Sequence, residues 1–261
     1  MALITKLWRE SWAVARRILT ELIRRKRSLI FWAIFPVAIL ILNGLIVAER
    51  ANLDVEVAFE QTAPTTLVGA ALFFSCLGGS VATLVAEREQ QTLKRLFISP
   101  LSGVSYFFGI FLAHAAIATG QGILVYTVAA FWGAGFTGSV PLAIAIICLS
   151  VIAYVGLGFL LGTQLARRTE DVNALIAAFG VPLLILGGAF LPASLFPETL
   201  LEIAQFNPIY HMTEALSGAT VAEAEWEELS EHLGFLGIFA IAMAILGWLS
   251  YRRMLHIERR L

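Results

Sequence analysis

The segment Glu87–Leu101 carries the residue types best suited to engaging another molecule. It reads Glu-Arg-Glu-Gln-Gln-Thr-Leu-Lys-Arg-Leu-Phe-Ile-Ser-Pro-Leu, and long stretches without charge flank it on both sides. Charges of both signs suit a polar groove, while Leu93, Leu96 and Phe97 form an apolar ridge at helical spacing. Pro100 disfavours helical backbone at the residue before it and so ends the predicted helix. The pattern favours a short docking helix for a soluble partner over an ordinary solvated loop.

Composition places this charged segment at a membrane surface. The chain is 59% hydrophobic and 14% charged, with a mean hydropathy of +0.82. Typical soluble domains are about 25% charged and about 45–50% apolar. Each ionisable side chain at the centre of a bilayer costs about 2.5–3.5 kcal/mol even on the most lenient scale. The sequence therefore indicates an integral membrane protein whose charged segment joins two spanning helices.

Six stretches without charge predict six transmembrane helices, because about 20 residues cross a hydrocarbon core about 30 Å thick. We place them at about residues 29–48, 64–86, 104–132, 142–165, 174–191 and 233–250. The uncharged run from Leu96 to Ala166 is too long for one crossing, and the Gly-rich stretch 133–141 divides it. An acidic loop is predicted at 49–63. The fold class is thus all-α, with one six-helix transmembrane domain over residues 29–261.

Residues 1–28 precede the first span and predict a basic amphipathic helix. Apolar residues recur at i, i+3, i+4 and i+7, and Lys and Arg occupy the opposite face. Such a helix suits the membrane interface rather than a cleavable signal peptide. The residues that we assign to the interface are Trp8, Trp12, Arg16, Arg17, Arg24 and Arg25.

The distribution of positive charge predicts the orientation. Of the 18 Lys and Arg residues, all but Arg50 fall on the side of the two termini if six helices span the membrane. The positive-inside rule then places both termini, the charged segment and the loop after the fourth span in the cytoplasm. Short apolar pieces within 192–232, on the opposite side, favour an extracellular re-entrant or interfacial hairpin.

Catalytic and metal-binding patterns are scarce in the sequence. It contains no H-E-x-x-H, G-x-S-x-G or G-x-x-x-x-G-K-[ST] motif. His114 lies within the third span, where an ionisable group suggests a function, although a neutral, hydrogen-bonded core histidine is favoured. Cys76 and Cys148 lie in apolar runs and are interpreted as small core residues. We predict no catalytic residue and no metal site.

The order of these features resembles the membrane subunit of ABC-2-type exporters, also called type V ABC exporters. The resemblance rests on six spans, the amphipathic N-terminal helix and the motif Glu-Arg-Glu-x-x-Thr-Leu-Lys-Arg-Leu-x-x-Ser-Pro-Leu. A second matching segment runs from Gly187 to Pro208. The chain looks most like the drug-resistance and lipid-export permeases and less like the polysaccharide exporters.

The resemblance implies a mechanism. Two permease chains, expected to be a homodimer within membrane lipid, would each engage one of two copies of a cytosolic ATP-binding subunit that carries ATP and Mg. No cofactor is expected on this chain, and no nucleic acid. The segment after the second span would couple ATP binding to export of an amphipathic, drug-like or lipid-linked substrate through a bacterial plasma membrane. The implied coupling residues are Glu87, Arg88, Glu89, Thr92, Leu93, Lys94, Arg95, Leu96, Phe97, Pro100 and Leu101.

The residues of the substrate pathway and its exit are inferred less directly than the coupling residues. The resemblance places an extracellular cap in the second matching segment, and aromatic side chains suit an amphipathic cargo. The assigned residues are Phe73, Phe74, Gly187, Gly188, Phe190, Phe196, Pro197, Asn207 and Pro208. Three alternatives stay open: a polysaccharide or glycolipid exporter permease, a six-span intramembrane enzyme, and a channel without an ATPase.

Overall fold

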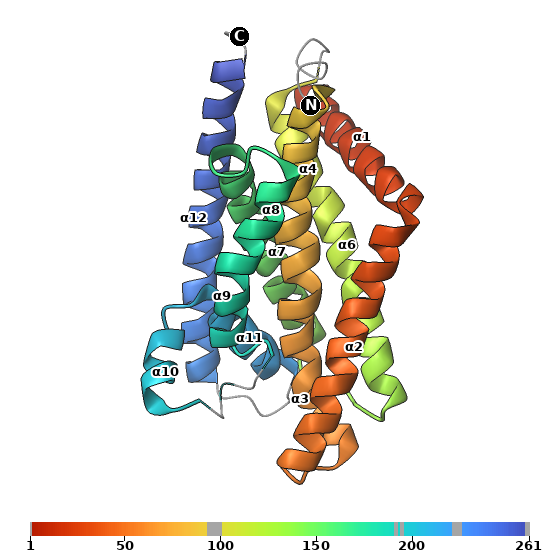
Figure 1. Ribbon diagram of the computed structural model, residues 1–261, viewed down its shortest axis with the longest axis vertical. Coiled ribbons are helices and arrows are strands. Elements are labelled where there is room, and N and C mark those ends of the chain that lie inside the picture. The colour runs from red at the N-terminus through yellow and green to blue at the C-terminus, as the bar shows by residue number, and fades with distance from the viewer. Residues whose placement is uncertain (1, 93–100, 191–192, 194–195, 221–225, 259–261) are drawn as a thin grey trace.

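The computed structural model describes residues 2–92, 101–190, 193, 196–220 and 226–258, and every regular element within these ranges is a helix. Figure 1 shows them as one upright bundle with both described chain ends at the same end. The first half comprises α1 (Ala2–Arg24), α2 (Lys26–Arg50), α3 (Val55–Thr66), η1 (Leu67–Gly78), α4 (Gly79–Glu89) and α6 (Gly103–Phe131). The second half comprises α7 (Val140–Gln164), α8 (Thr169–Leu175), η2 (Ile176–Gly180), α9 (Val181–Leu186), α10 (Glu198–Ala204), α11 (Pro208–Thr220) and α12 (Trp226–Glu258).

Within the described residues, six helices are long and apolar enough to cross a membrane, which confirms the predicted number and the all-α class. They are Lys26–Arg50, Val55–Glu89, Gly103–Phe131, Val140–Gln164, Thr169–Leu186 and Leu229–His256. Two of them are continuous helices that contain a wider π-helical stretch, η1 in the second and η2 in the fifth. The stretch 133–141 is indeed the turn between α6 and α7, and Gly133 there has a φ of 91°.

The second span differs most from the prediction. The segment 49–63, expected to be an acidic loop, is helical from Val55 onward. Ala58, Phe59 and Thr62 are buried in the register of a helix, so α3 has an apolar inner face on the core. Glu56 and Glu60 are not buried, which explains how a span can extend through a segment that contains carboxylates.

At the centre of the bundle, α7 packs against α12, α4, η1 and α6. Its Gly156 lies so close to α12 that a Cβ atom there would be 2.6 Å from the carbonyl carbon of Met243. Gly247 of α12 faces it in the same way, because its Cβ would lie 2.5 Å from the carbonyl oxygen of Gly156. Small residues that allow two backbones to approach are a common device for packing helices in membranes.

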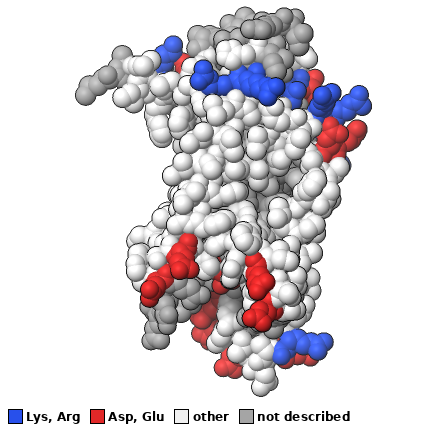
Figure 2. Space-filling model, turned by 90° about the vertical axis from the view of Figure 1, so that its left-hand side faces the viewer, with Lys and Arg blue, Asp and Glu red and all other residues white. Residues whose placement is uncertain are grey.

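Charge separates the two ends of the bundle. Figure 2 shows a band of Lys and Arg at the end that holds both chain ends, an uncharged middle, and mainly acidic residues at the opposite end. This distribution agrees with the six-span count. The sidedness that the positive-inside rule assigns to it stays a prediction.

Between the fifth and sixth spans, the described residues form the short helices α10 and α11, which lie toward the end of the bundle opposite the two chain ends (Figure 1). Asn207 joins α11 to α9, since its side-chain amide donates to the carbonyl of Leu183 at 2.6 Å while its oxygen accepts from the N–H of Ile209 at 3.0 Å. Thr213 donates to the carbonyl of Gly187 at 2.7 Å. The chain therefore folds back on the bundle here, in the segment where we predicted a hairpin.

Candidate functional site at the junction of α1, α4 and α6

Helix α1 packs lengthwise on α6 through a narrow face. Val14, Ala15 and Ile18 are buried, and Gly109 of α6 gives Val14 room, because a Cβ at Gly109 would lie 2.6 Å from the Cβ of Val14. Trp8 faces away from the bundle and keeps 61% of its surface exposed. Ala2–Arg24 is thus a helix with one face on the bundle and both tryptophans directed outward, a disposition that suits a membrane interface. Its place in the interface stays a prediction.

Glu87, near the end of α4, holds the centre of the junction. Its side chain is only 9% exposed, and Arg17 of α1 donates to one carboxylate oxygen while the Tyr106 hydroxyl of α6 donates to the other. One buried carboxylate therefore joins three helices. A charge in such a place is stable only when it is paired and hydrogen-bonded, so the three side chains depend on one another.

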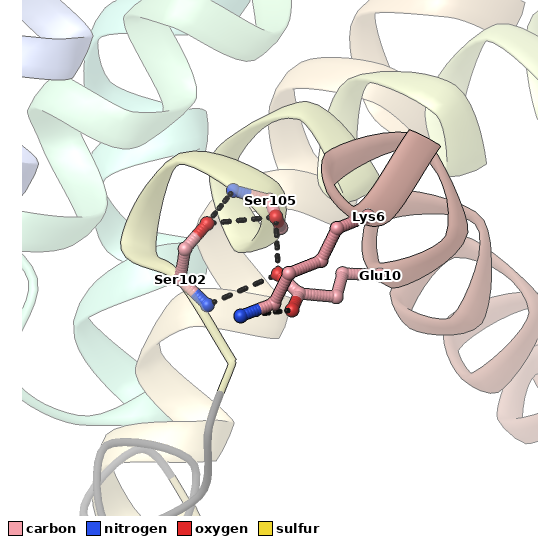
Figure 3. A network of polar contacts seen from close by, with 4 residues as sticks. All are labelled: Lys6, Glu10, Ser102 and Ser105. Carbon is pink, nitrogen blue, oxygen red and sulfur yellow. Dashed lines mark hydrogen bonds and ion pairs between the residues drawn. The ribbon is translucent and has the colours of Figure 1, made fainter. Parts of the chain in front are cut away.

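A second network joins α1 to the beginning of α6 (Figure 3). Glu10 accepts a hydrogen bond from the Ser105 hydroxyl at 2.6 Å and one from the backbone N–H of Ser102 at 3.3 Å. Lys6 lies 3.7 Å from its other oxygen. Ser102 also caps α6, because its hydroxyl oxygen accepts from the N–H of Ser105 at 3.0 Å.

These two networks stand on either side of the connection between α4 and α6. Glu87 lies just before this connection and Ser102 just after it, and both bind side chains of the same helix, α1. The residues on both sides of the connection are therefore attached to α1.

The next two residues of α4 are bound to the other side of the bundle. Arg88 donates to the carbonyl oxygens of Gly162 and Ala166 in and after α7, at 3.2 and 3.3 Å. Glu89 accepts from the hydroxyl of Thr169, at the start of α8, at 2.6 Å and from its N–H at 3.2 Å. The connection is thereby linked to the loop between the fourth and fifth spans as well.

The predicted coupling residues fall into two sets: those that the structure describes and those in 93–100. Glu87, Arg88 and Glu89 belong to the end of α4 and have partners inside the chain, so Glu87 is not a surface charge in this structure. Gln91 has a φ of 56°, so the helical path of α4 does not continue through it. Thr92 and Leu101 are half-buried, while residues 93–100 lie outside the described residues. The coupling role of the segment stays a prediction.

Among the predicted interface residues, the arginines take two roles. Arg16, Arg24 and Arg25 are exposed, as expected of side chains that face water and lipid head groups. Arg17 instead turns to Glu87. From the sequence alone, nothing distinguishes it from its neighbour Arg16.

The residues predicted for a substrate pathway do not gather around one space. Phe73 is buried against Tyr154 with ring centroids 5.8 Å apart, and Gly187 packs against Ile209. A cavity of about 1200 Å³ instead lies between α3, α6, α7 and α11. Its lining includes none of the nine predicted pathway residues, all of which fall in the described ranges. The assignment of the pathway stays untested.

The remaining polar candidates have ordinary surroundings. His114 is buried, and its Nδ1 lies 2.8 Å from the carbonyl oxygen of Ile110 one turn earlier in α6. Cys76 is a core residue as predicted, but Cys148 is exposed and lines the cavity, which corrects its prediction. In the part of the chain that the structure describes, no three His, Cys, Asp or Glu side chains are grouped to hold a metal ion.

Glu10 predicts a pH dependence of the junction. The hydrogen bond from Ser105 holds the pKa of this carboxyl below its ordinary value of 4.5. The carboxylate therefore contributes its stabilisation fully above pH 4.5 and loses it as pH falls through the lowered pKa. We expect the thermal stability of the protein to fall more steeply below pH 4.5 in the wild type than in Glu10→Gln. Parallel curves for the two proteins would contradict the role of this carboxylate.

The residues at this junction that sequence reasoning missed are Lys6, Glu10, Ser102, Ser105 and Tyr106. A signal existed for Ser102, because a serine just before an apolar run is a common helix N-cap. No signal in one sequence could connect Glu10 to a serine 95 positions away.

The fold and this junction define a multi-pass helical membrane protein whose N-terminal helix is attached at the connection between the second and third spans. The family model described as ABC-2 type transporter matches residues 9–221. The chain belongs to the ABC-2 type transporter family. The match covers α1 from Arg9 onward, the junction except Lys6, and the first five spans.

Two curated relatives from Escherichia coli (strain K12) are similar at low identity. One is the "Probable multidrug ABC transporter permease YbhR", 24% identical over 172 residues, which cover 66% of this chain and 46% of that protein. The other is the "Inner membrane transport permease YhhJ", 26% identical over 132 residues, which cover 50% of this chain and 35% of that protein. The matched part spans less than half the length of either relative.

Proposed function

We propose that this chain is the membrane-spanning subunit of an ATP-driven exporter, acting with a separate ATP-binding subunit in a bacterial plasma membrane. Membership of the ABC-2 type transporter family supports a transport role. The names of the relatives, a probable multidrug permease and an inner membrane transport permease, support export of drug-like molecules and this location. Two permease chains would then work with two ATP-binding chains that carry ATP and Mg.

The observation that carries the proposal is the double attachment of α1 around the connection between α4 and α6. Glu87 binds Arg17 before the connection, and Glu10 binds Ser102 after it. An ATP-binding subunit that pushes on residues 90–101 would thus move α1, α4 and α6 together. A passive channel has no need of such a linkage, and an intramembrane enzyme would require a partner for His114 that activates it.

An amphipathic substrate suits the uncharged middle of the bundle (Figure 2). An ion pathway normally carries ionisable residues at bilayer depth. A large hydrophilic sugar polymer would likewise need polar walls to replace its hydration. The drug-like or lipid-linked substrate is therefore favoured over a polysaccharide.

Substitution in the connection tests the coupling. We expect Leu96→Asp and Lys94→Glu to insert into the membrane and to keep their thermal stability, yet to lower export by about tenfold or more, because a few residues carry most of the binding energy of an interface and a reversed charge opposes docking. The measurement is the resistance of the host to a panel of amphipathic drugs, compared with a strain that lacks the gene. Glu89 is unsuitable for this test, because its reversal would also break the hydrogen bonds to Thr169.

Arg50→Glu is the matched control, since Arg50 lies at the acidic end of the bundle, far from the connection. Its export should equal that of the wild type. Undiminished export by both Leu96→Asp and Lys94→Glu would contradict the assignment of the connection as the coupling element.

A further inference from the structure

The cavity of about 1200 Å³ between α3, α6, α7 and α11 is larger than the roughly 300–1,000 Å³ of most ligand sites. Apolar side chains of α6 and α7 form most of its wall. Ile123 and Ile144, one on each helix, are 66% and 56% exposed, so the cavity continues onto the outer surface of the bundle. A hydrophobic molecule can therefore enter it from the side.

The charge of the cavity has a single sign. Its ionisable lining is acidic, with Glu60 of α3 and Glu214 of α11, and no Lys, Arg or His is among the described residues that line it. Helices α3 and α11 pack against each other, toward the end of the bundle opposite the two chain ends (Figure 1). A carboxylate beside an apolar wall attracts a cation and repels an anion of the same shape.

An aromatic side chain adds a second feature. Tyr126 lines this cavity, while its hydroxyl oxygen is buried and has no hydrogen-bond partner among the described residues. Buried hydroxyls are usually paired, so a turn of this side chain toward a ligand would break no hydrogen bond to a described residue. The ring of Tyr126 meets Phe136 edge to face at 5.9 Å. Aromatic faces attract organic cations, which adds to the attraction exerted by the carboxylates.

We propose that this cavity binds a hydrophobic organic cation with a single positive charge. The apolar body lies along α6 and α7, and the charge lies at the end formed by Glu60, Glu214 and Tyr126. A phospholipid acyl chain would fit the apolar wall but carries no positive charge to place beside the carboxylates. That the protein exports such cations rests on the proposed function; if it does, this cavity is where they bind. The binding itself requires no ATPase.

Tetraphenylphosphonium and tetraphenylborate test the charge directly, because they have nearly the same size and shape but opposite charge. We expect purified protein in phosphatidylcholine nanodiscs to bind the cation and not the anion. Glu60→Gln/Glu214→Gln should raise the dissociation constant of the cation by about tenfold or more. At Glu60, Gln keeps an oxygen for the N–H of Gly135, which Glu60 binds at 2.8 Å, and loses only the charge.

Glu56→Gln is the matched control, one turn earlier on α3 and not part of the lining. It should bind the cation as the wild type does. Equal binding of the two probes, or equal affinity of the wild type and the double variant for tetraphenylphosphonium, would overturn the proposal. Normal probe binding in a protein that captures no ATPase would refute the proposed function and leave this site intact.

Cys148 offers a second readout, because it lines the cavity and is exposed while Cys76 is buried. Reaction of Cys148 with N-ethylmaleimide should slow when tetraphenylphosphonium is present and stay unchanged with tetraphenylborate. A Cys148 that is unreactive without any probe would show that lipid or a second copy of the chain fills the cavity, which would also overturn the proposal.

Discussion

Replacement of Arg17 by Ala will lower the free energy of unfolding by about 3 kcal/mol. The substitution leaves the Glu87 carboxylate buried with no opposite charge, and breaking a buried pair from one side costs about 3–5 kcal/mol. We expect the lower end of that range because the Arg17 side chain is 30% exposed. Titration with sodium dodecyl sulfate in mixed micelles, followed by circular dichroism, measures the difference.

Two variants separate the pair from other effects of substitution. Arg16→Ala changes the exposed neighbour on the same helix and should stay within about 0.5 kcal/mol of the wild type. Arg17→Met/Glu87→Leu removes both charges and should be more stable than Arg17→Ala, because no uncompensated charge remains. If Arg17→Ala is as stable as Arg16→Ala, the buried pair does not hold the junction together.

Introduction of a single methyl group at Gly156 should separate α7 from α12. A Cβ there meets backbone atoms of Met243 and Ala244 at 2.6 and 2.8 Å, and backbone cannot move aside as a side chain does. Overpacking typically costs about 1–3 kcal/mol, and we expect at least the upper part of that range for Gly156→Ala. The same detergent titration measures it.

Gly237→Ala is the control for this substitution, since a Cβ at that position of α12 meets nothing within 4 Å. Alanine there should stabilise the helix by up to about 1 kcal/mol. Equal effects of the two substitutions would mean that α7 and α12 do not pack through Gly156.

Much of the fold could be predicted because the length of an uncharged stretch determines whether a helix can cross a bilayer. The first, third and fourth spans differ from prediction by only a few residues. The second failed at Val55–Ala63 because we took carboxylates as evidence for a loop. The burial of Ala58, Phe59 and Thr62 shows that a helix can keep one apolar face while Glu56 and Glu60 remain outside the core.

The junction was less predictable, because a charge pattern does not indicate which partner each charge will find. Glu87 reads in the sequence as a docking charge, yet its partner Arg17 is 70 positions earlier. Helical spacing located α1 and its exposed tryptophans, but the choice between Arg16 and Arg17 depends on how α1 lies on α6. For the same reason, the cavity walls on α6 and α7 could not be identified from two uniformly apolar stretches.

Capture of the tagged chain from its native host in a mild detergent tests the central claim most directly. The soluble proteins that remain bound are identified by mass spectrometry, and the complex is assayed for ATP hydrolysis. An ATP-binding chain at one copy per permease, with hydrolysis in the eluate, is the result that we predict. A permease that retains no ATP-binding chain under conditions that preserve its helical fold would contradict an ATP-driven exporter.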